Sequence, residues 1–209
     1  TTASLDQLCA QTNPEERVDV PTGVGFCMYI RRDSLADVGL FDVENFGKGY
    51  GEENDFCVRA VKRGWRHLLT LDTYVRHAGG VSFGEAKTPR EREAVEKLRR
   101  LHPEYEAMVH RHVADDPARV ARLRLDLARI RQAGLPGVLA VTHSRGCGTE
   151  RHVQELADLL ADKLNCFALR PMPSGVTELT WLRRGEAFKL AFSLPADFPD
   201  LIEALRALG

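Results

Sequence analysis

Hydrophobic and polar residues follow three different patterns along the chain. Residues 1–17 are polar and aperiodic, which predicts a loop or frayed segment before the first folded element. Residues 18–84 are rich in glycine and aromatic side chains, and the apolar run 24–30 predicts a buried strand after the turn at 21–23. The same stretch predicts a short helix, a longer helix and a strand at residues 32–39, 52–62 and 67–71.

Residues 85–134 are dominated by charged side chains, between which apolar residues recur at helical spacing. Leu98, Leu101 and Tyr105 belong to one such series, and a further helix is expected from 117 to 132. An amphipathic helical connector explains this pattern. The many arginines then form a solvated face rather than a nucleic-acid site.

A break at residues 134–136 opens a third region with an alternating strand and helix pattern. The apolar run 137–143 predicts a buried parallel strand, a loop follows at 144–148, and an amphipathic helix is expected from 149 to 164. This order is the opening of a doubly wound domain, so the fold class is α/β. Further strands and a final helix are expected at 166–170, 177–182 and 187–194, and from about 199.

Composition narrows the class of protein only a little. The formal net charge of −1 provides no field that would attract nucleic acid or an anionic membrane. The five scattered cysteines contain no Cys-x-x-Cys pair, which argues against a disulfide framework and suits a reducing compartment. The chain begins with Thr1, and we expect it to be an internal piece of a longer protein.

Candidate chemistry concentrates in residues 50–56, Tyr-Gly-Glu-Glu-Asn-Asp-Phe. A glycine permits a tight turn, after which two adjacent carboxylates stand at a helix N-terminus that stabilises their ionised forms. Such a carboxylate can serve as a general base toward a hydroxyl group. Helix capping alone explains the same acidic cluster, and the spacing leaves both interpretations open.

The stretch 18–84 resembles the second half of family 2 glycosyltransferases, which have the GT-A fold. The resemblance covers about 65 residues and rests on several motifs in a fixed order. These motifs are Pro21-x-Gly23, Cys27–Arg32, Val38–Asp42, Gly51–Arg59, Gly64–Trp65 and His77–Phe83.

This resemblance implies a role for each matching residue. Glu53 corresponds to the catalytic base of inverting members, with Glu in place of the commoner Asp. Glu52, Asp55 and the aromatic Tyr50 are expected to bind the acceptor, with a structural role left open for Asp55. His77 is expected to bind a divalent cation, Mn²⁺ or Mg²⁺, whose remaining ligands lie outside this chain. A loop near the donor diphosphate is expected from Gly79, Gly80 and Ser82.

The third region resembles the first strand, loop and helix of family 4 glycosyltransferases, which have the GT-B fold. The match extends over about a dozen residues, 142–153, in which Cys147 interrupts the usual glycine pair. Small residues let such a loop approach a ligand above a helix N-terminus. The loop and helix residues implied are Gly146, Gly148, Thr149, Glu150 and His152, and His152 faces either the acceptor or the core.

Together the resemblances imply three parts: the end of a GT-A module at 1–88, a helical connector at 89–134, and the start of a Rossmann-like GT-B module at 135–209. The expected activity is inverting transfer from a nucleotide sugar to a saccharide or lipid-linked saccharide in cell-surface polysaccharide or O-antigen synthesis. We expect a cytoplasmic location, peripheral to a membrane, and no nucleic-acid partner. The donor half of the GT-A family has no counterpart here, so this chain alone is expected to be inactive. The alternative is a non-catalytic carbohydrate-binding or scaffolding module.

Overall fold

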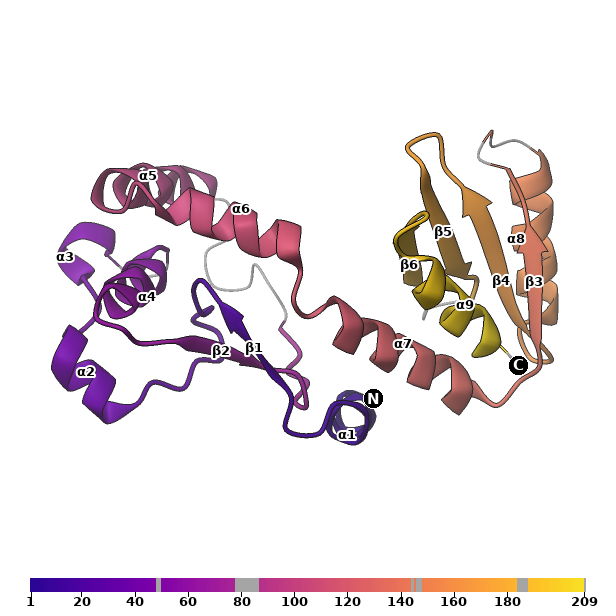
Figure 1. The fold of residues 1–209 in the computed structure, drawn as a ribbon, viewed down its shortest axis with the longest axis horizontal. Helices are drawn as coiled ribbons and strands as arrows, with labels where there is room; N and C mark the ends of the chain where they lie inside the picture. Colours follow the sequence, from indigo (N-terminus) through magenta and orange to yellow (C-terminus); the bar gives the residue numbers. More distant parts are fainter. Residues whose placement is uncertain (48–49, 78–86, 144, 146–147, 184–187, 209) are drawn as a thin grey trace. The chain divides into compact units, whose positions relative to one another are not determined.

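A computed structural model describes residues 1–47, 50–77, 87–143, 145, 148–183 and 188–208. These residues form two compact units, Thr1–Ala121 and Arg122–Gly209 (Figure 1). Both combine helices with a sheet, which confirms the predicted α/β class. No described helix is long and apolar enough to cross a membrane.

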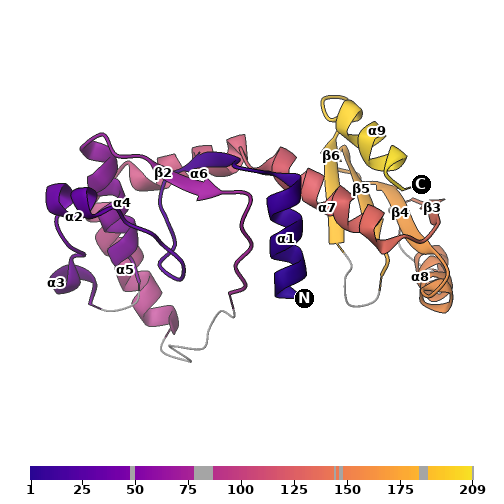
Figure 2. The same ribbon diagram turned by 90° about the horizontal axis from the view of Figure 1, so that it is seen from below.

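The first unit contains a two-stranded antiparallel sheet and several helices. Figure 2 shows α2, α3, α4 and α5 gathered at the end of this unit away from α1. Its helices are α1 (Thr2–Thr12), α2 (Arg32–Val38), α3 (Val43–Phe46), α4 (Glu52–Lys62), α5 (Lys87–Leu101) and α6 (Tyr105–Asp115), and its strands are β1 (Arg17–Val20) and β2 (His67–Thr70).

The prediction of a loop over residues 1–17 is wrong, because α1 and β1 occupy this stretch. The Thr1 hydroxyl accepts a hydrogen bond from the backbone N–H of Ser4, which caps the helix. Leu8 and Cys9 are buried. The side-chain amide of Asn13 donates to the carbonyl oxygen of Ala121 at 3.2 Å. The apolar residues of α1 show only weak helical periodicity, so the sequence does not predict this helix. Tertiary contacts of a few residues stabilise it instead.

The apolar run 24–30 is not the buried strand that its composition predicts. The backbone N–H of Cys27 donates to the carbonyl oxygen of Val24 at 3.4 Å, which closes a turn. Phe26 and Tyr29 are exposed. Among the residues that the structure describes, no strand pairs with this run, and apolar composition without a neighbouring strand does not make a sheet.

Helix α4 forms the core of the first unit and ends where the sequence predicts. Phe56, Cys57 and Ala60 are fully or almost fully buried, and they pack with Val38 of α2 and with Trp65. Burying a side chain such as Phe56 stabilises the unit by about 2 kcal/mol. The helix therefore has a fixed position, and the acidic residues of its first turn are fixed with it.

Helices α5 and α6 belong to the first unit instead of standing apart from it. Contacts between α3 and α5 and between α5 and α6 join them to the segments around α4, and Ala94 and Leu98 of α5 are buried. The boundary at Ala121–Arg122 thus falls inside α7 (Arg119–Ala133). The three-part division at residues 88 and 134 stays a prediction.

The second unit is built on a four-stranded sheet in the order β3-β4-β5-β6. Strands β3 and β4, which α8 connects, pair in parallel, as predicted. The pairs β4–β5 and β5–β6 are antiparallel. The sheet is therefore mixed and not fully parallel, unlike that of a doubly wound domain built only from parallel strands. Helix α8 runs alongside β3 and β4 (Figure 1). The elements are β3 (Gly137–Val141), α8 (Gly148–Leu160), β4 (Asn165–Pro171), β5 (Val176–Trp181), β6 (Phe188–Ser193) and α9 (Phe198–Arg206).

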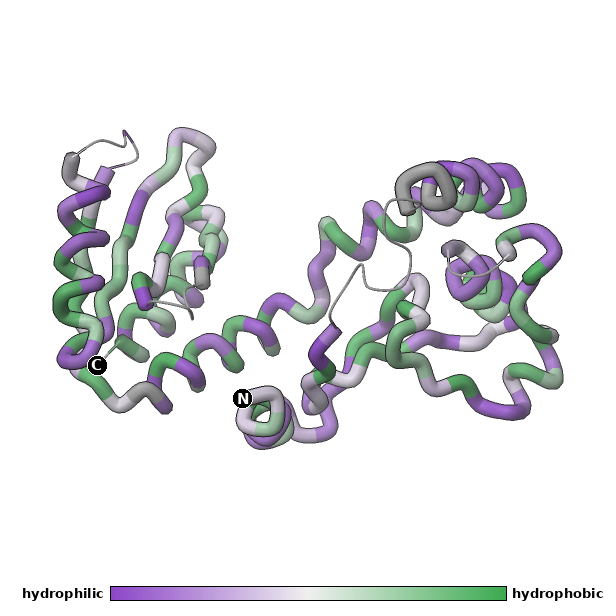
Figure 3. The backbone as a smooth tube through the Cα atoms, turned by 180° about the vertical axis from the view of Figure 1, so that it is seen from behind, coloured by the Kyte–Doolittle hydropathy of each residue, from purple (hydrophilic) through white to green (hydrophobic). Residues whose placement is uncertain are grey.

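One face of this sheet carries the core of the second unit. Leu123, Leu127 and Ile130 lie on one side of α7 and pack, together with α9, against Phe167 and Trp181. Figure 3 shows the hydrophobic and hydrophilic positions alternating along α7. Strand β3 lies at the edge of the sheet, and Val141 is 71% exposed. Strand β3, which the sequence predicts to be buried, is therefore only partly buried.

We expect Gly137→Ala to destabilise the second unit by about 3 kcal/mol or more. A Cβ at residue 137 would lie 2.0 Å from the carbonyl oxygen of Leu208, so the backbone of β3 or of the segment after α9 would have to move. Gly148→Ala is the matched control, because a Cβ there meets no atom within 4 Å. Denaturant unfolding of both variants measures the difference, and equal midpoints would contradict the prediction.

Candidate functional site

Gly51 produces the turn that presents the acidic residues. It caps the N-terminus of α4 with a φ of 92°, a left-handed conformation that favours glycine. A Cβ at this position would lie 2.8 Å from Cδ1 of Phe46 and 3.3 Å from Cβ of Ala94. Glu52 and Glu53 follow at once in the first turn, where the helix dipole stabilises negative charge.

Glu53 is half-buried, and its environment changes its acidity. Burial is the main cause that raises the pKa of Glu53 above its usual 4.5, and the negative charge of Glu52 raises it further. Hydrogen bonds from the backbone N–H groups at the helix start oppose this shift without cancelling it. A carboxylate whose pKa lies closer to neutrality is a better proton acceptor, and such shifts are concentrated at functional sites.

The turn at residues 21–25 lies against the same side of α4 as Glu53. A Cβ on Gly25 would lie 3.9 Å from the carboxyl carbon of Glu53. One helical turn further on, Sγ of Cys57 accepts a hydrogen bond from the backbone N–H of Gly23 at 3.3 Å. Burial raises the pKa of the Cys57 thiol, and the charge of Glu53 adds to this shift. The Glu53 carboxyl group therefore lies between α4 and this turn.

Tyr105 is a site residue that the sequence reading missed, because its spacing marked it only as part of an apolar helix face. It is the first residue of α6, and its hydroxyl group hydrogen-bonds to the side chain of Thr22. Burial chiefly raises the pKa of Tyr105, and the charge of Glu53 contributes to the shift. The sequence feature that could have indicated this role is a tyrosine, an aromatic residue with a polar hydroxyl group, at the first position of a helix.

His77 lies in the same region because its ring stacks on Phe26. The ring centroids are 4.3 Å apart and the planes differ by 9°. Phe26 is 49% exposed and His77 is exposed as well. Phe26 follows Gly25, the residue that faces Glu53. The structure thus places an open aromatic surface close in the chain to the half-buried carboxylate.

A divalent cation remains a prediction for this region. Within the described ranges, no three His, Cys, Asp or Glu side chains gather closely enough to hold a metal ion. His77 is the one described residue for which the sequence predicts such a role, and a single imidazole does not complete a coordination shell. Gly79, Gly80 and Ser82, predicted to lie near a diphosphate, are outside the described residues.

Asp55 is buried and already bonded on both carboxylate oxygens. Nε of Arg59 donates to Oδ2 at 2.8 Å, and Nε2 of His102 lies 2.7 Å from Oδ1. These contacts fit the structural role that the sequence left open for Asp55. Its role in acceptor binding stays a prediction.

Both ring nitrogens of His102 have a polar partner. Nδ1 lies 3.0 Å from Nζ of Lys62, and Nε2 lies 2.7 Å from Oδ1 of Asp55. Lys62 also pairs with Glu104 at 2.7 Å. The His102 side chain thus links α4 to the segment between α5 and α6.

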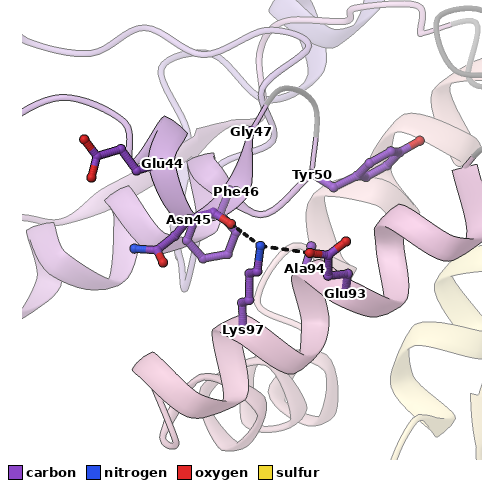
Figure 4. A pocket seen from close by; sticks show the side chains of 8 residues that line it. All are labelled: Glu44, Asn45, Phe46, Gly47, Tyr50, Glu93, Ala94 and Lys97. Atoms are coloured by element: carbon purple, nitrogen blue, oxygen red, sulfur yellow. Dashed lines mark hydrogen bonds and ion pairs between the residues drawn. The ribbon is translucent and has the colours of Figure 1, made fainter.

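Two further residues predicted to bind the acceptor occupy the same turn. Glu52 is half-buried next to Glu53. Tyr50 lines a pocket of about 490 Å³ together with residues of α3 and α5, among them Glu93 and Lys97 (Figure 4). The structure therefore brings Tyr50, Glu52 and Glu53 together on the two sides of Gly51.

The predicted residues of the second unit cluster at the start of α8. Gly148 begins the helix, Thr149 and Glu150 follow in its first turn, and Gly146 is outside the described residues. Oε1 of Glu150 pairs with Nη1 of Arg170 on β4 at 3.0 Å. His152 is exposed, so the core position left open by its sequence is excluded.

Comparisons with models of protein families, with curated proteins and with solved structures found no match.

We expect Asp55→Asn to destabilise the first unit by about 3–5 kcal/mol, because it weakens a buried pairing with Arg59 and His102. Asp33→Asn is the matched control. Asp33 also pairs with an arginine, Arg31, but both side chains are more than half exposed, so little change is expected. Denaturant unfolding measures both variants, and similar effects would contradict the prediction.

The raised pKa of Glu53 predicts a pH-dependent stability difference. Between its usual pKa of 4.5 and the higher folded value, the folded state holds the proton more tightly than the unfolded state. The free energy of unfolding therefore falls as the pH rises through this interval. Glu53→Gln should remove this loss and be more stable than the wild type at pH 7, with the gain absent below pH 4.5. Exposed Glu96→Gln is the control, and a pH-independent difference would refute the assignment.

Proposed function

We propose that this chain supplies the acceptor side and the general base of a nucleotide-sugar glycosyltransferase domain of the GT-A type. The observation that carries the proposal is the half-buried carboxyl group of Glu53, whose pKa burial raises. It stands at a helix N-terminus behind a glycine turn, and the neighbouring turn carries the exposed ring pair of Phe26 and His77. The ordered motifs of residues 18–84 support the same class of enzyme.

In the proposed reaction, Glu53 takes the proton of an acceptor hydroxyl as its oxygen attacks the anomeric carbon of the donor sugar. A bond forms between this oxygen and the anomeric carbon, while the bond to the diphosphate oxygen breaks and its electron pair leaves with the nucleoside diphosphate. Attack from the opposite face inverts the configuration at that carbon. The raised pKa keeps Glu53 suited to this transfer near neutral pH.

The remaining chemistry of the reaction concerns the charge of the leaving diphosphate. A divalent cation would neutralise that charge, and His77 is the residue of this chain proposed to contact it. Tyr105 and Thr22, which are hydrogen-bonded to each other beside Glu53, hold the turn at residues 21–25 in place. Their role is to position Glu53 rather than to transfer a proton.

We propose that the second unit is the start of a Rossmann-like GT-B module within the same larger enzyme. The parallel unit β3–α8–β4 supports this interpretation. Gly148, Thr149 and Glu150 lie beyond the carboxyl end of β3, the edge at which α/β sheets bind ligands. An enzyme of this kind would act on cell-surface saccharides at the cytoplasmic face of a membrane.

We expect Glu53→Gln, introduced into the full-length protein, to lower the rate of sugar transfer by about 10²–10⁴-fold while donor binding persists. Glutamine keeps the shape of the side chain but cannot accept the proton. Glu53→Asp should retain part of the activity because it keeps the carboxylate at a shorter reach. The control is Glu96→Gln, which removes an exposed carboxylate from α5.

Transfer is measured as product formed from a radiolabelled nucleotide sugar, with initial rates compared at equal protein concentration. Unchanged turnover in Glu53→Gln would exclude Glu53 as the base. Saccharide binding without transfer or nucleotide-sugar hydrolysis in the full-length wild type would favour a binding or scaffolding module instead. In that module, Asp55 and its neighbours would serve only to hold α4.

A further inference from the structure

We propose that the pocket between α3 and α5 is a subsite for a neutral sugar ring of the acceptor, an inference that rests on the proposed function. The pocket has a volume of about 490 Å³, within the range of small-molecule sites. Figure 4 shows the rings of Phe46 and Tyr50 and the charged groups of Glu93 and Lys97 around it. Glu44, Asn45, Gly47 and Ala94 complete the lining.

The walls of the pocket are fixed by interactions within the protein. Nζ of Lys97 donates to the backbone carbonyl oxygen of Asn45 at 2.5 Å and pairs with Oε1 of Glu93 at 3.0 Å. The side-chain amide of Asn45 donates in turn to Asp42 at 2.6 Å. The bond between Lys97 and Asn45 joins α5 to α3, so the walls are held together before a ligand arrives and little ordering is required on binding.

The lining residues match the two faces of a sugar. Tyr50 and Phe46 offer aromatic surfaces for the apolar C–H face of a pyranose ring. Glu44 and Glu93 provide carboxylate oxygens that accept hydrogen bonds from neighbouring hydroxyl groups. The described contacts use two of the three N–H groups of Lys97, which leaves one to donate to a sugar oxygen.

The charge of the lining separates a neutral sugar from a phosphorylated one. The lining contains two acidic residues, Glu44 and Glu93, and one basic residue, Lys97. The lining therefore carries net negative charge, and a phosphate group would be repelled. The nucleotide part of the donor is thereby disfavoured here, and the neutral acceptor saccharide is the occupant that fits.

The position of the pocket connects it to the proposed base. Phe46 and Ala94 lie directly against Gly51, and Tyr50 precedes that glycine. Three residues of extended chain span at most about 11 Å, so Tyr50 and Glu53 are within reach of one oligosaccharide. We infer that a ring further along the acceptor occupies the pocket while a terminal hydroxyl group reaches Glu53.

Saturation-transfer NMR with the full-length protein tests the subsite. The probes are methyl glycosides of glucose, galactose, mannose and N-acetylglucosamine, each with its β-linked disaccharide. We expect saturation of the ring protons of at least one probe, and a dissociation constant raised about tenfold or more in Tyr50→Ala and in Glu93→Gln. Glu96→Gln, on the exposed side of the same helix, should bind as the wild type does.

Thermal unfolding of each variant identifies any loss of binding that is caused by misfolding. The Glu93→Gln variant also weakens the ion pair with Lys97, so its effect on binding can be indirect. The Tyr50→Phe variant is a milder test, because it keeps the aromatic ring and should keep most of the affinity. Equal binding in Tyr50→Ala and the wild type, or no saturation of any probe, would overturn the subsite. The outcome is separate from the transfer assay of Glu53→Gln, so either proposal can fail while the other holds.

Discussion

The first unit depends on the buried carboxylate of Asp55, because a buried charge must be paired to be tolerated. Arg59 and His102 supply the pairing from two different parts of the chain. The guanidinium group of Arg59 also donates to the carbonyl oxygens of Val38 and Leu40, at 2.8 and 2.9 Å. One carboxylate therefore fixes α4 relative to the end of α2 and to the segment between α5 and α6, and the candidate site is assembled from these parts.

Two carboxylates of the same helical turn have been given different surroundings. Asp55 has both oxygens occupied by protein donors, whereas burial and a neighbouring negative charge raise the pKa of Glu53. The contrast in surroundings suits a structural role for Asp55 and a chemical role for Glu53. Tyr105 and the turn at residues 21–25 complete the surroundings of Glu53.

The sequence predicts well the elements whose signals are local. Helix α4 follows from a glycine, an acidic first turn and a glycine stop, and the strands of the second unit follow from apolar runs between turns. Prediction from sequence is wrong where the structure of a segment depends on contacts with distant residues. Helix α1 is stabilised by the hydrogen bond from Asn13 to Ala121. The run 24–30 forms a turn, and no strand of the described residues pairs with it. Tyr105 and His102 were missed for the same reason, since their partners lie 40 or more residues away.

Gly51 has a consequence for how such a site can diversify. Its left-handed backbone joins the acidic turn on one side to the pocket wall on the other, and any side chain would strike Phe46. A larger residue at this position would therefore have to displace the pocket wall or the acidic turn. Glu93, in contrast, stands on α5, outside this turn. Selectivity can therefore evolve on one helix while the reactive group is inherited unchanged on another.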